Sequence, residues 1–312
     1  MLSIITMICD GTESLLDNWV KNTQEKVKIE KELIVVDNTT AQTVAESSLY
    51  KVVKMGHNAM QFAGRRAGVE AAKGDYIFLV DCDDEILPIN SFNWDEELIC
   101  FNYMATKPDS KDEYICSNPY TLSYTASKGI FFDYNWRNAV KNMVWNKFYS
   151  RDLLLRVYSK LPYFEICFME DVLLNIFVLA EVKSIRFEAK AFYRYFFGTG
   201  VSTKKVYTDI EPLKRLFVGM ETALSVFNLA FSKEAQEQSG LTTIGFYRGC
   251  IEYALEKYGN LAPGLEEPYT KMIGKYFDKA LLLKVLKNQT DRDIDRKTML
   301  KAKHCINDYM DN

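Results

Sequence analysis

Hydrophobic residues in the first 80 positions form short continuous runs, and the stretches between them show helical spacing. The first run stops at Asp10-Gly11, a pair typical of turns. Strands that alternate with helices through short connections form a parallel sheet, and continuously apolar strands fit a sheet covered on both faces. The pattern therefore predicts strands over residues 2–9, 33–36 and 76–80, with helices that begin near residue 15 and span 62–74.

The pattern is less regular after these strands. It predicts a strand over 98–103, loops with an edge strand over 104–129, a helix start within 138–157, a helix over 171–180, and short strands over 182–187 and 191–197. From about residue 208 the apolar spacing is helical, and the composition changes near 205. We therefore expect an α/β domain over 1–205 and a helical C-terminal region over 206–312, which serves packing, oligomerisation as a homodimer, or contact with a membrane surface.

Composition narrows the function classes. The chain has 312 residues, of which 48% are hydrophobic and 26% charged, as in ordinary globular proteins. A net charge of −3 gives no general reason to expect nucleic acid as the partner. The seven cysteines are scattered without a CxxC pair, which argues against a structural zinc site and a disulfide framework. The N-terminus lacks a basic leader, and no apolar stretch approaches ~20 residues, so we expect a cytoplasmic protein with peripheral membrane contact at most.

Three carboxylates crowd the end of the third predicted strand: Asp81, Asp83 and Asp84. Because ligands of parallel α/β sheets lie beyond the carboxyl ends of the strands, Asp10 and Asp37 are expected at the same edge. Such like charges repel one another unless a cation or a donor-rich ligand shares the site. Mg²⁺ and Mn²⁺ bind carboxylate oxygens and leave coordination positions for substrate phosphates. The alternative is a solvated acidic turn.

Six blocks of the sequence, in order, resemble the family 2 glycosyltransferases, which have the GT-A fold. They are SIITMICD (3–10), ELIVVDNTT (32–40), NAMQFAGRRAG (58–68), AAKGDYIFLVDCDDEIL (71–87), VWNKFYSRDLL (144–154) and FMEDVLLNI (168–176), and FYRYFFGTGVST (192–203) resembles the stretch that closes many of these domains. The resemblance covers about residues 1–205. It implies inverting, metal-dependent transfer of a sugar from a nucleotide-diphosphate donor, with UDP favoured, to a hydroxyl of a growing glycan or lipid-linked acceptor.

The resemblance also implies roles for individual residues. Asp83 is the expected ligand of Mg²⁺ or Mn²⁺, Asp81 meets the ribose or the outer shell of the metal, and Asp84 either assists or faces water. Asp171, beside Glu170, matches the base that takes the proton of the acceptor. The alternative is that Asp171 is a helix N-cap and Glu170 a surface charge.

The donor site implied by the resemblance lies around the first three strands. Asp37 matches a carboxylate that accepts a hydrogen bond from the nucleotide base, and its alternative role is to cap a following helix. Arg65 matches an arginine that bridges base, carboxylate and phosphate, whereas Arg66 stays open and both could form a solvated helix face. The expected nucleotide-sugar-binding residues are Met7, Cys9, Asp10, Asp37, Arg65, Asp81 and Glu170.

Four residues depart from the family pattern near the nucleotide. Met7 replaces a proline, Cys9 an aromatic residue that stacks on the base, Asp10 an asparagine, and Met60 a common glycine. These changes leave a non-catalytic sugar-nucleotide-binding or scaffold protein as the alternative function. A dinucleotide-binding dehydrogenase would need Gly-x-Gly-x-x-Gly after the first strand, and the sequence there does not supply it.

Two further segments have two interpretations each. Trp145 is expected in the core, and the alternative is that Trp145 and Lys147 contact a sugar ring and a phosphate. Residues 273–288 interleave apolar residues with lysines. This segment is expected to pack on the protein or on a second copy, and the alternative is that it lies on an anionic membrane surface.

Overall fold

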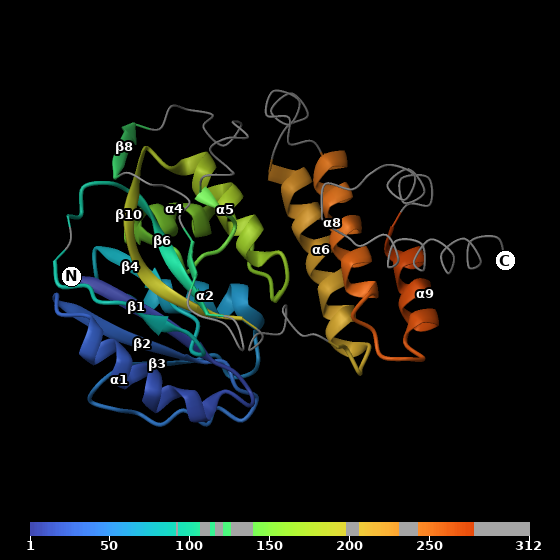
Figure 1. The fold of residues 1–312 in the computed structure, drawn as a ribbon, viewed down its shortest axis with the longest axis horizontal. Helices are drawn as coiled ribbons and strands as arrows, with labels where there is room; N and C mark the ends of the chain where they lie inside the picture. Colours follow the sequence, from blue (N-terminus) through green and yellow to red (C-terminus); the bar gives the residue numbers. More distant parts are fainter. Residues whose placement is uncertain are drawn as a thin grey trace. The chain divides into compact units, whose positions relative to one another are not determined.

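The computed structural model describes residues 1–91, 93–106, 113–115, 121–125, 140–197, 206–230 and 243–277. The chain divides into two compact units, Met1–Gly200 and Val201–Asn312 (Figure 1). The first unit contains the sheet and the candidate site residues, and the second is helical.

One sheet organises the first unit (Figure 1). Its strands are β1 (Leu2–Ile8), β2 (Lys31–Asp37), β3 (Lys51–Lys54), β4 (Tyr76–Leu79), β5 (Glu85–Ile86), β6 (Leu98–Thr106), β7 (Glu113–Ile115), β8 (Leu122–Thr125), β9 (Lys147–Ser150) and β10 (Ser184–Phe196). Their order is β3-β2-β1-β4-β9-β6-β10-β5, with β7 paired to β6 and β8 to β10. The long ladders β1–β2 and β6–β10 are parallel, whereas β9 runs antiparallel to both of its neighbours. The predicted α/β fold with a mostly parallel, GT-A-like sheet is confirmed.

Helices cover both faces of this sheet, as the continuously apolar strands predicted. The helices of the first unit are the short 3₁₀ helix η1 (Glu13–Leu15), α1 (Leu16–Lys26), α2 (Met60–Ala71), α4 (Arg151–Lys160) and α5 (Glu170–Glu181). Ile4 of β1 belongs to the same core cluster as Trp19 of α1. The next residue, Ile5, faces α2, because a Cβ on Gly68 would lie only 2.5 Å from Ile5 Cγ2. Glycine at this position lets α2 lie close to the sheet.

The register of the parallel strands positions the site. Ile8 of β1 pairs with Asp37 of β2, and Ile5 of β1 pairs with Leu79 of β4. The residues that follow these three strands therefore meet at one edge of the sheet, as the sequence predicted. This edge carries Asp10, Asp37 and the acidic turn after β4.

Several predicted elements were wrong in detail. The two strands expected over 182–187 and 191–197 are one strand, β10, whose register shifts between Glu188 and Ala191. Within 138–157 the structure has strand β9, and α4 begins only after Ser150, whose hydroxyl accepts a hydrogen bond from the Leu153 N–H. The pattern also missed β3 and β5. Of residues 104–129, the described part contains the end of β6 together with β7 and β8.

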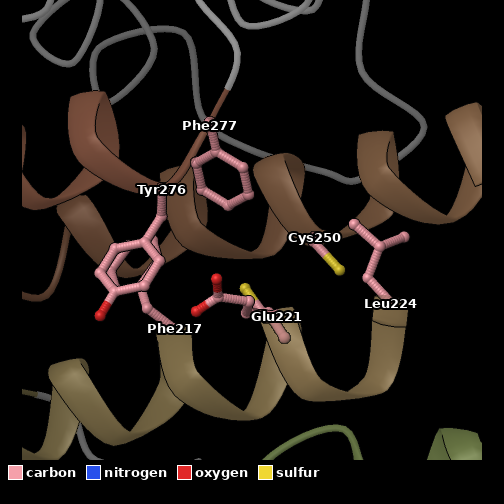
Figure 2. Close-up of a pocket in the computed structure, with 7 residues that line it drawn as sticks. Phe217, Glu221, Leu224, Cys250, Tyr276 and Phe277 are labelled. Carbon is pink, nitrogen blue, oxygen red and sulfur yellow. The ribbon is translucent and has the colours of Figure 1, made fainter. Parts of the chain in front are cut away.

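The second unit is helical over its described residues, as predicted. Its helices are α6 (Glu211–Ala230), α8 (Thr243–Tyr258) and α9 (Glu266–Tyr276). A small cavity of about 50 Å³ in this unit is lined by Phe217, Met220, Glu221, Leu224, Cys250, Tyr276 and Phe277. Figure 2 shows this pocket in close-up. Ile273 of α9 is buried, so the start of segment 273–288 packs within this unit, whereas residues from 278 lie outside the described part. Among the described residues, no helix is both long and apolar enough to cross a membrane.

Candidate active site

Arg65 joins two acidic segments that lie far apart in the sequence. Its Nη1 donates to Glu170 Oε1 at 2.9 Å, and its Nη2 donates to Asp81 Oδ1 at 3.2 Å. The side chains of Arg65 and Glu170 are only 10% and 11% exposed, whereas Asp81 is 36% exposed. Burial alone lowers the pKa of Arg65, but Asp81 and Glu170 outweigh it and raise the pKa, so the guanidinium stays charged. The acidic turn after β4 and the start of α5 therefore form one site.

The start of α2 is shaped so that Arg65 reaches this position. A Cβ on Gly64 would lie 2.4 Å from Met7 Sδ, so glycine allows the thioether of Met7 to pack against the helix beside Arg65. Met60, the first residue of α2, has φ +62°, a left-handed conformation that favours glycine. This backbone conformation is a physical reason for the glycine that the resemblance implies at position 60. The contact of Met7 with a nucleotide stays a prediction.

The acidic turn is tied to β10 through Asp84. Asp84 is 5% exposed; its Oδ2 accepts a hydrogen bond from the Tyr193 hydroxyl at 2.7 Å and its Oδ1 accepts one from the Phe196 N–H at 2.8 Å. The Tyr193 hydroxyl in turn accepts a hydrogen bond from the Asp81 N–H at 3.2 Å. Burial and then Asp81 raise the pKa of Asp84 to about 8. Asp84 thus points inward and not to water, and Asp81 and Asp83 are the partly exposed carboxylates of the turn.

The acidic turn is the candidate metal site. Among the described residues, the structure has no group of three acidic, histidine or cysteine side chains arranged to hold a metal ion. Mg²⁺, however, is commonly held by one or two carboxylates, with substrate phosphates and water as its other ligands. Asp81 and Asp83 offer such hard oxygen donors two residues apart, so the donor set fits Mg²⁺ or Mn²⁺ bound together with a diphosphate.

Glu170 and Asp171 open α5 on the other side of Arg65. The residue before them, Met169, has φ +64° and makes no side-chain cap, so both carboxylates lie in the first helical turn. Asp171 Oδ1 accepts a hydrogen bond from the Val172 N–H at 2.7 Å. The alternatives from the sequence are therefore wrong, because Asp171 is not the N-cap and Glu170 is buried. Burial raises the pKa of Asp171, which suits a group that takes a proton near neutral pH.

Asp37 is fully buried at the end of β2 and organises the following loop. Its Oδ1 accepts hydrogen bonds from the Thr39 hydroxyl at 2.7 Å and the Thr39 N–H at 3.2 Å. Its Oδ2 accepts one from the Val44 N–H at 2.9 Å. Residues 38–50 contain a turn and a bend but no helix, so Asp37 does not cap a following helix. Both carboxylate oxygens have partners within the loop, and the contact of Asp37 with a base stays a prediction.

Asp10 and Cys9 lie at the exposed side of the same edge. Asp10 accepts hydrogen bonds from the Thr40 N–H at 2.8 Å, the Thr40 hydroxyl at 2.7 Å and Asn58 Nδ2 at 3.5 Å, and the bonds from Thr40 lower its pKa. Cys9 Sγ accepts a contact from Asn38 Nδ2 at 3.7 Å, and burial raises the pKa of this thiol. These hydrogen bonds join the segments that follow β1, β2 and β3. They lie at Cys9, where the resemblance implies an aromatic side chain.

The sequence did not indicate the anchoring role of Tyr193, and the alternative in which Lys147 contacts a phosphate is wrong. Lys147 is fully buried, and its Nζ donates to the Met143 carbonyl and, at 2.7 Å, to Asn146 Oδ1, so it does not face a phosphate. Trp145 is a core residue, as expected, and stacks on Tyr193 with ring centroids 4.5 Å apart. In the sequence, Lys147 lies between Val144-Trp145 and Phe148-Tyr149, and this placement among apolar residues was the available signal for a buried charge.

Comparisons with known proteins bear on the family and the fold of this chain. The family model described as "Glycosyl transferase family 2" matches residues 3–162. Among solved structures, S. aureus TarS 1–349 in complex with UDP-GlcNAc is similar, with a TM-score of 0.57 at 14% identity over 99% of this chain and 91% of that chain. A second structure of S. aureus TarS 1–349 gives a TM-score of 0.55 at 14% identity over the same shares of the two chains. These likenesses show the fold. None of the curated proteins matches this chain significantly in sequence.

Proposed function

Because this chain belongs to glycosyl transferase family 2 and is a glycosyltransferase, we propose that it transfers a sugar from a UDP-sugar to an acceptor hydroxyl with inversion at the anomeric carbon. The acceptor we propose is a growing glycan or a lipid-linked saccharide. The observation that carries the proposal is the Arg65 bridge, which brings the acidic turn and the start of α5 into one site.

Each side of this bridge has a separate task. Asp171, in the first turn of α5, takes the proton of the acceptor hydroxyl as that oxygen attacks the sugar. Arg65 keeps Asp81 and Glu170 in place, and its charge lies at the donor side of the site. Asp83, with Asp81 beside it, would hold Mg²⁺ or Mn²⁺, which supplies positive charge against the leaving diphosphate when bound.

The choice of UDP rests on the resemblance and on the similar TarS structure, which was solved in complex with UDP-GlcNAc. Around the proposed base site this chain has Cys9, Asp10, Asn38 and Asn58, which are polar or small and are joined by hydrogen bonds. We therefore expect recognition of the base through hydrogen bonds more than through stacking.

Donor binding gives the first test. Calorimetric titration of UDP-, GDP- and dTDP-sugars, with and without Mn²⁺, is compared for the wild type, Asp83→Ala and the control Asp17→Ala, an exposed carboxylate on α1. We expect Mn²⁺-dependent binding of a UDP-sugar that Asp83→Ala loses and Asp17→Ala keeps. Absence of nucleotide binding under all conditions would contradict the proposal. For any acceptor that supports turnover, NMR of the product tests inversion, because an α-linked donor must give a β-linked product.

Lipid-linked acceptors would place the enzyme at the cytoplasmic face of a membrane, as a peripheral protein. Flotation with vesicles of anionic phospholipid tests this, and we expect weak association that disappears as the salt concentration rises. Vesicles that bind no protein at low ionic strength would exclude the membrane part of the proposal. Sedimentation of the free protein tests whether it forms a homodimer.

A further inference from the structure

Lys147 is a fully buried cation whose hydrogen-bond partners are neutral. Its Nζ donates to the Met143 carbonyl and to Asn146 Oδ1, at 2.7 Å for the latter. A buried ammonium group is costly unless a charge of opposite sign lies close to it. The question is therefore which carboxylate compensates Lys147.

The segment that holds Lys147 is tied directly to the start of α5. Asn175 of α5 is 2% exposed, and its Nδ2 donates to the Asn142 carbonyl at 2.5 Å and to the Asp171 carbonyl at 2.8 Å. Both partners are oxygens, so the amide orientation of Asn175 is determined. The backbone that carries Met143 and Lys147 is thereby attached to the turn that carries Asp171, and Lys147 and Asp171 interact electrostatically.

Asp171 has few other sources of positive charge. Within the part of the chain that the structure describes, no ion pair within 4.0 Å includes Asp171, and Arg65 is already paired with Asp81 and Glu170. Three other ionisable groups surround the pair. Glu170 on α5 repels Asp171, Tyr149 lies on β9, and Cys100 of β6 is the strand partner of Lys147 of β9. The last two are neutral near pH 7 because burial raises the pKa of both. Arg65 and then Lys147 lower the pKa of Asp171, and of these two cations only Arg65 also forms ion pairs with carboxylates among the described residues.

We propose that Lys147 is a positioning residue for Asp171, an internal ammonium group behind the catalytic carboxylate that keeps it ionised and oriented toward the acceptor. The inference rests on the proposed role of Asp171 as the base. Lys147 itself does not touch the substrate, since it is fully buried. Its effect passes through charge and through the Asn175 hydrogen bonds.

The direct test is NMR titration of the Asp171 carboxyl in protein with ¹³C-labelled aspartate, assigned with Asp171→Asn. In Lys147→Met, a charge-free variant of similar length, the titration midpoint of Asp171 is expected to rise by about 1. The control Tyr149→Phe removes a buried hydrogen bond to the Val144 carbonyl from the same strand without changing charge, and the midpoint should stay unchanged. An unchanged midpoint in folded Lys147→Met would overturn the proposal.

A reciprocal titration covers the case in which Lys147→Met does not fold. Because the interaction is mutual, Asp171→Asn should lower the midpoint of Lys147, observed through its ¹³Cε signal, by a similar amount. This variant changes a partly exposed side chain. A Lys147 midpoint that does not move would overturn the proposal equally.

The pH profile of turnover separates this inference from the proposed function. The acid limb of kcat should move to higher pH in Lys147→Met by the shift seen by NMR, with the KM of the donor unchanged. If the NMR midpoints move but Asp171→Asn retains full turnover, the role of Asp171 as the base is wrong although the pair exists. If the midpoints do not move, the inference about Lys147 fails whatever Asp171 does in catalysis.

Discussion

Replacement of Arg65 by methionine tests how the site is held together. The side chain keeps most of its length but loses the guanidinium, so Glu170, 11% exposed, loses an ion pair of 2.9 Å. Removal of one partner from a buried pair costs about 3–5 kcal/mol. Asp81 loses a pair of 3.2 Å, but its 36% exposure lets solvent screen the charge, and this adds at most about 1 kcal/mol. We expect the free energy of unfolding to fall by about 4 kcal/mol in total.

Urea unfolding followed by tryptophan fluorescence is the suitable assay. All four tryptophans, at positions 19, 94, 136 and 145, belong to the first unit, so the signal reports on that unit. Arg66→Met is the matched control, because Arg66 follows on the same helix and its ion pair with Glu70, which is 52% exposed, is worth less than about 1 kcal/mol. The double variant Arg65→Met/Glu170→Gln should recover most of the loss, since the unpaired buried charge is gone.

The effect of Arg65→Met should also depend on pH. Burial and then Asp171 raise the pKa of Glu170 in the folded protein, and Arg65 opposes this rise. When the pKa of a carboxyl group is raised in the folded state, the protein becomes less stable as the pH rises from the unfolded pKa of that group toward its folded pKa. Without Arg65 this loss grows, so the variant should be impaired more at pH 8 than at pH 5. A cost below about 1 kcal/mol at pH 8, or a double variant no more stable than Arg65→Met, would refute the reasoning.

Three further substitutions probe other parts of the site. Asp84→Asn places an amide NH₂ against one of the two donors, the Tyr193 hydroxyl or the Phe196 N–H, and should cost about 1–3 kcal/mol in urea unfolding. Mn²⁺ titration should show unchanged affinity, and lost affinity at full stability would make Asp84 a ligand. Met60→Gly relieves the left-handed backbone and should raise the unfolding free energy by about 0.5–1 kcal/mol, and a decrease would contradict the strain. Trp145→Ala should cost about 3–5 kcal/mol by calorimetry, because Trp145 is buried and stacked; a cost below about 1 kcal/mol would contradict its core role.

The edge of the sheet was predictable from local sequence. Apolar runs that end at Asp10, Asp37 and Asp81 are strand signals, and parallel strands bring their carboxyl ends together by geometry. The parallel pairings of Ile8 with Asp37 and of Ile5 with Leu79 confirm this convergence. Such predictions succeed because each depends only on the apolar run that forms one strand and on the residue at which that run ends.

Contacts between distant segments were not predictable in this way. Glu170 lies 105 residues from Arg65, and Tyr193 lies 109 residues from Asp84, so no local pattern indicates either contact. The inward orientation of Asp84 depends on those partners, and an acidic turn looks the same whichever carboxylate turns inward. Strand β9 was missed because it has only four residues and pairs antiparallel with both of its neighbours, β4 and β6.

The most direct test of the proposed activity measures donor affinity and turnover separately for Asp171→Asn. UDP-sugar affinity is measured by calorimetry with Mn²⁺, and turnover by release of UDP in the presence of acceptor. A base that acts only in the chemical step contributes about 10²–10⁴-fold to the rate. We predict a loss of that size in kcat with donor affinity unchanged, whereas turnover close to that of the wild type would contradict the assignment of Asp171 as the base.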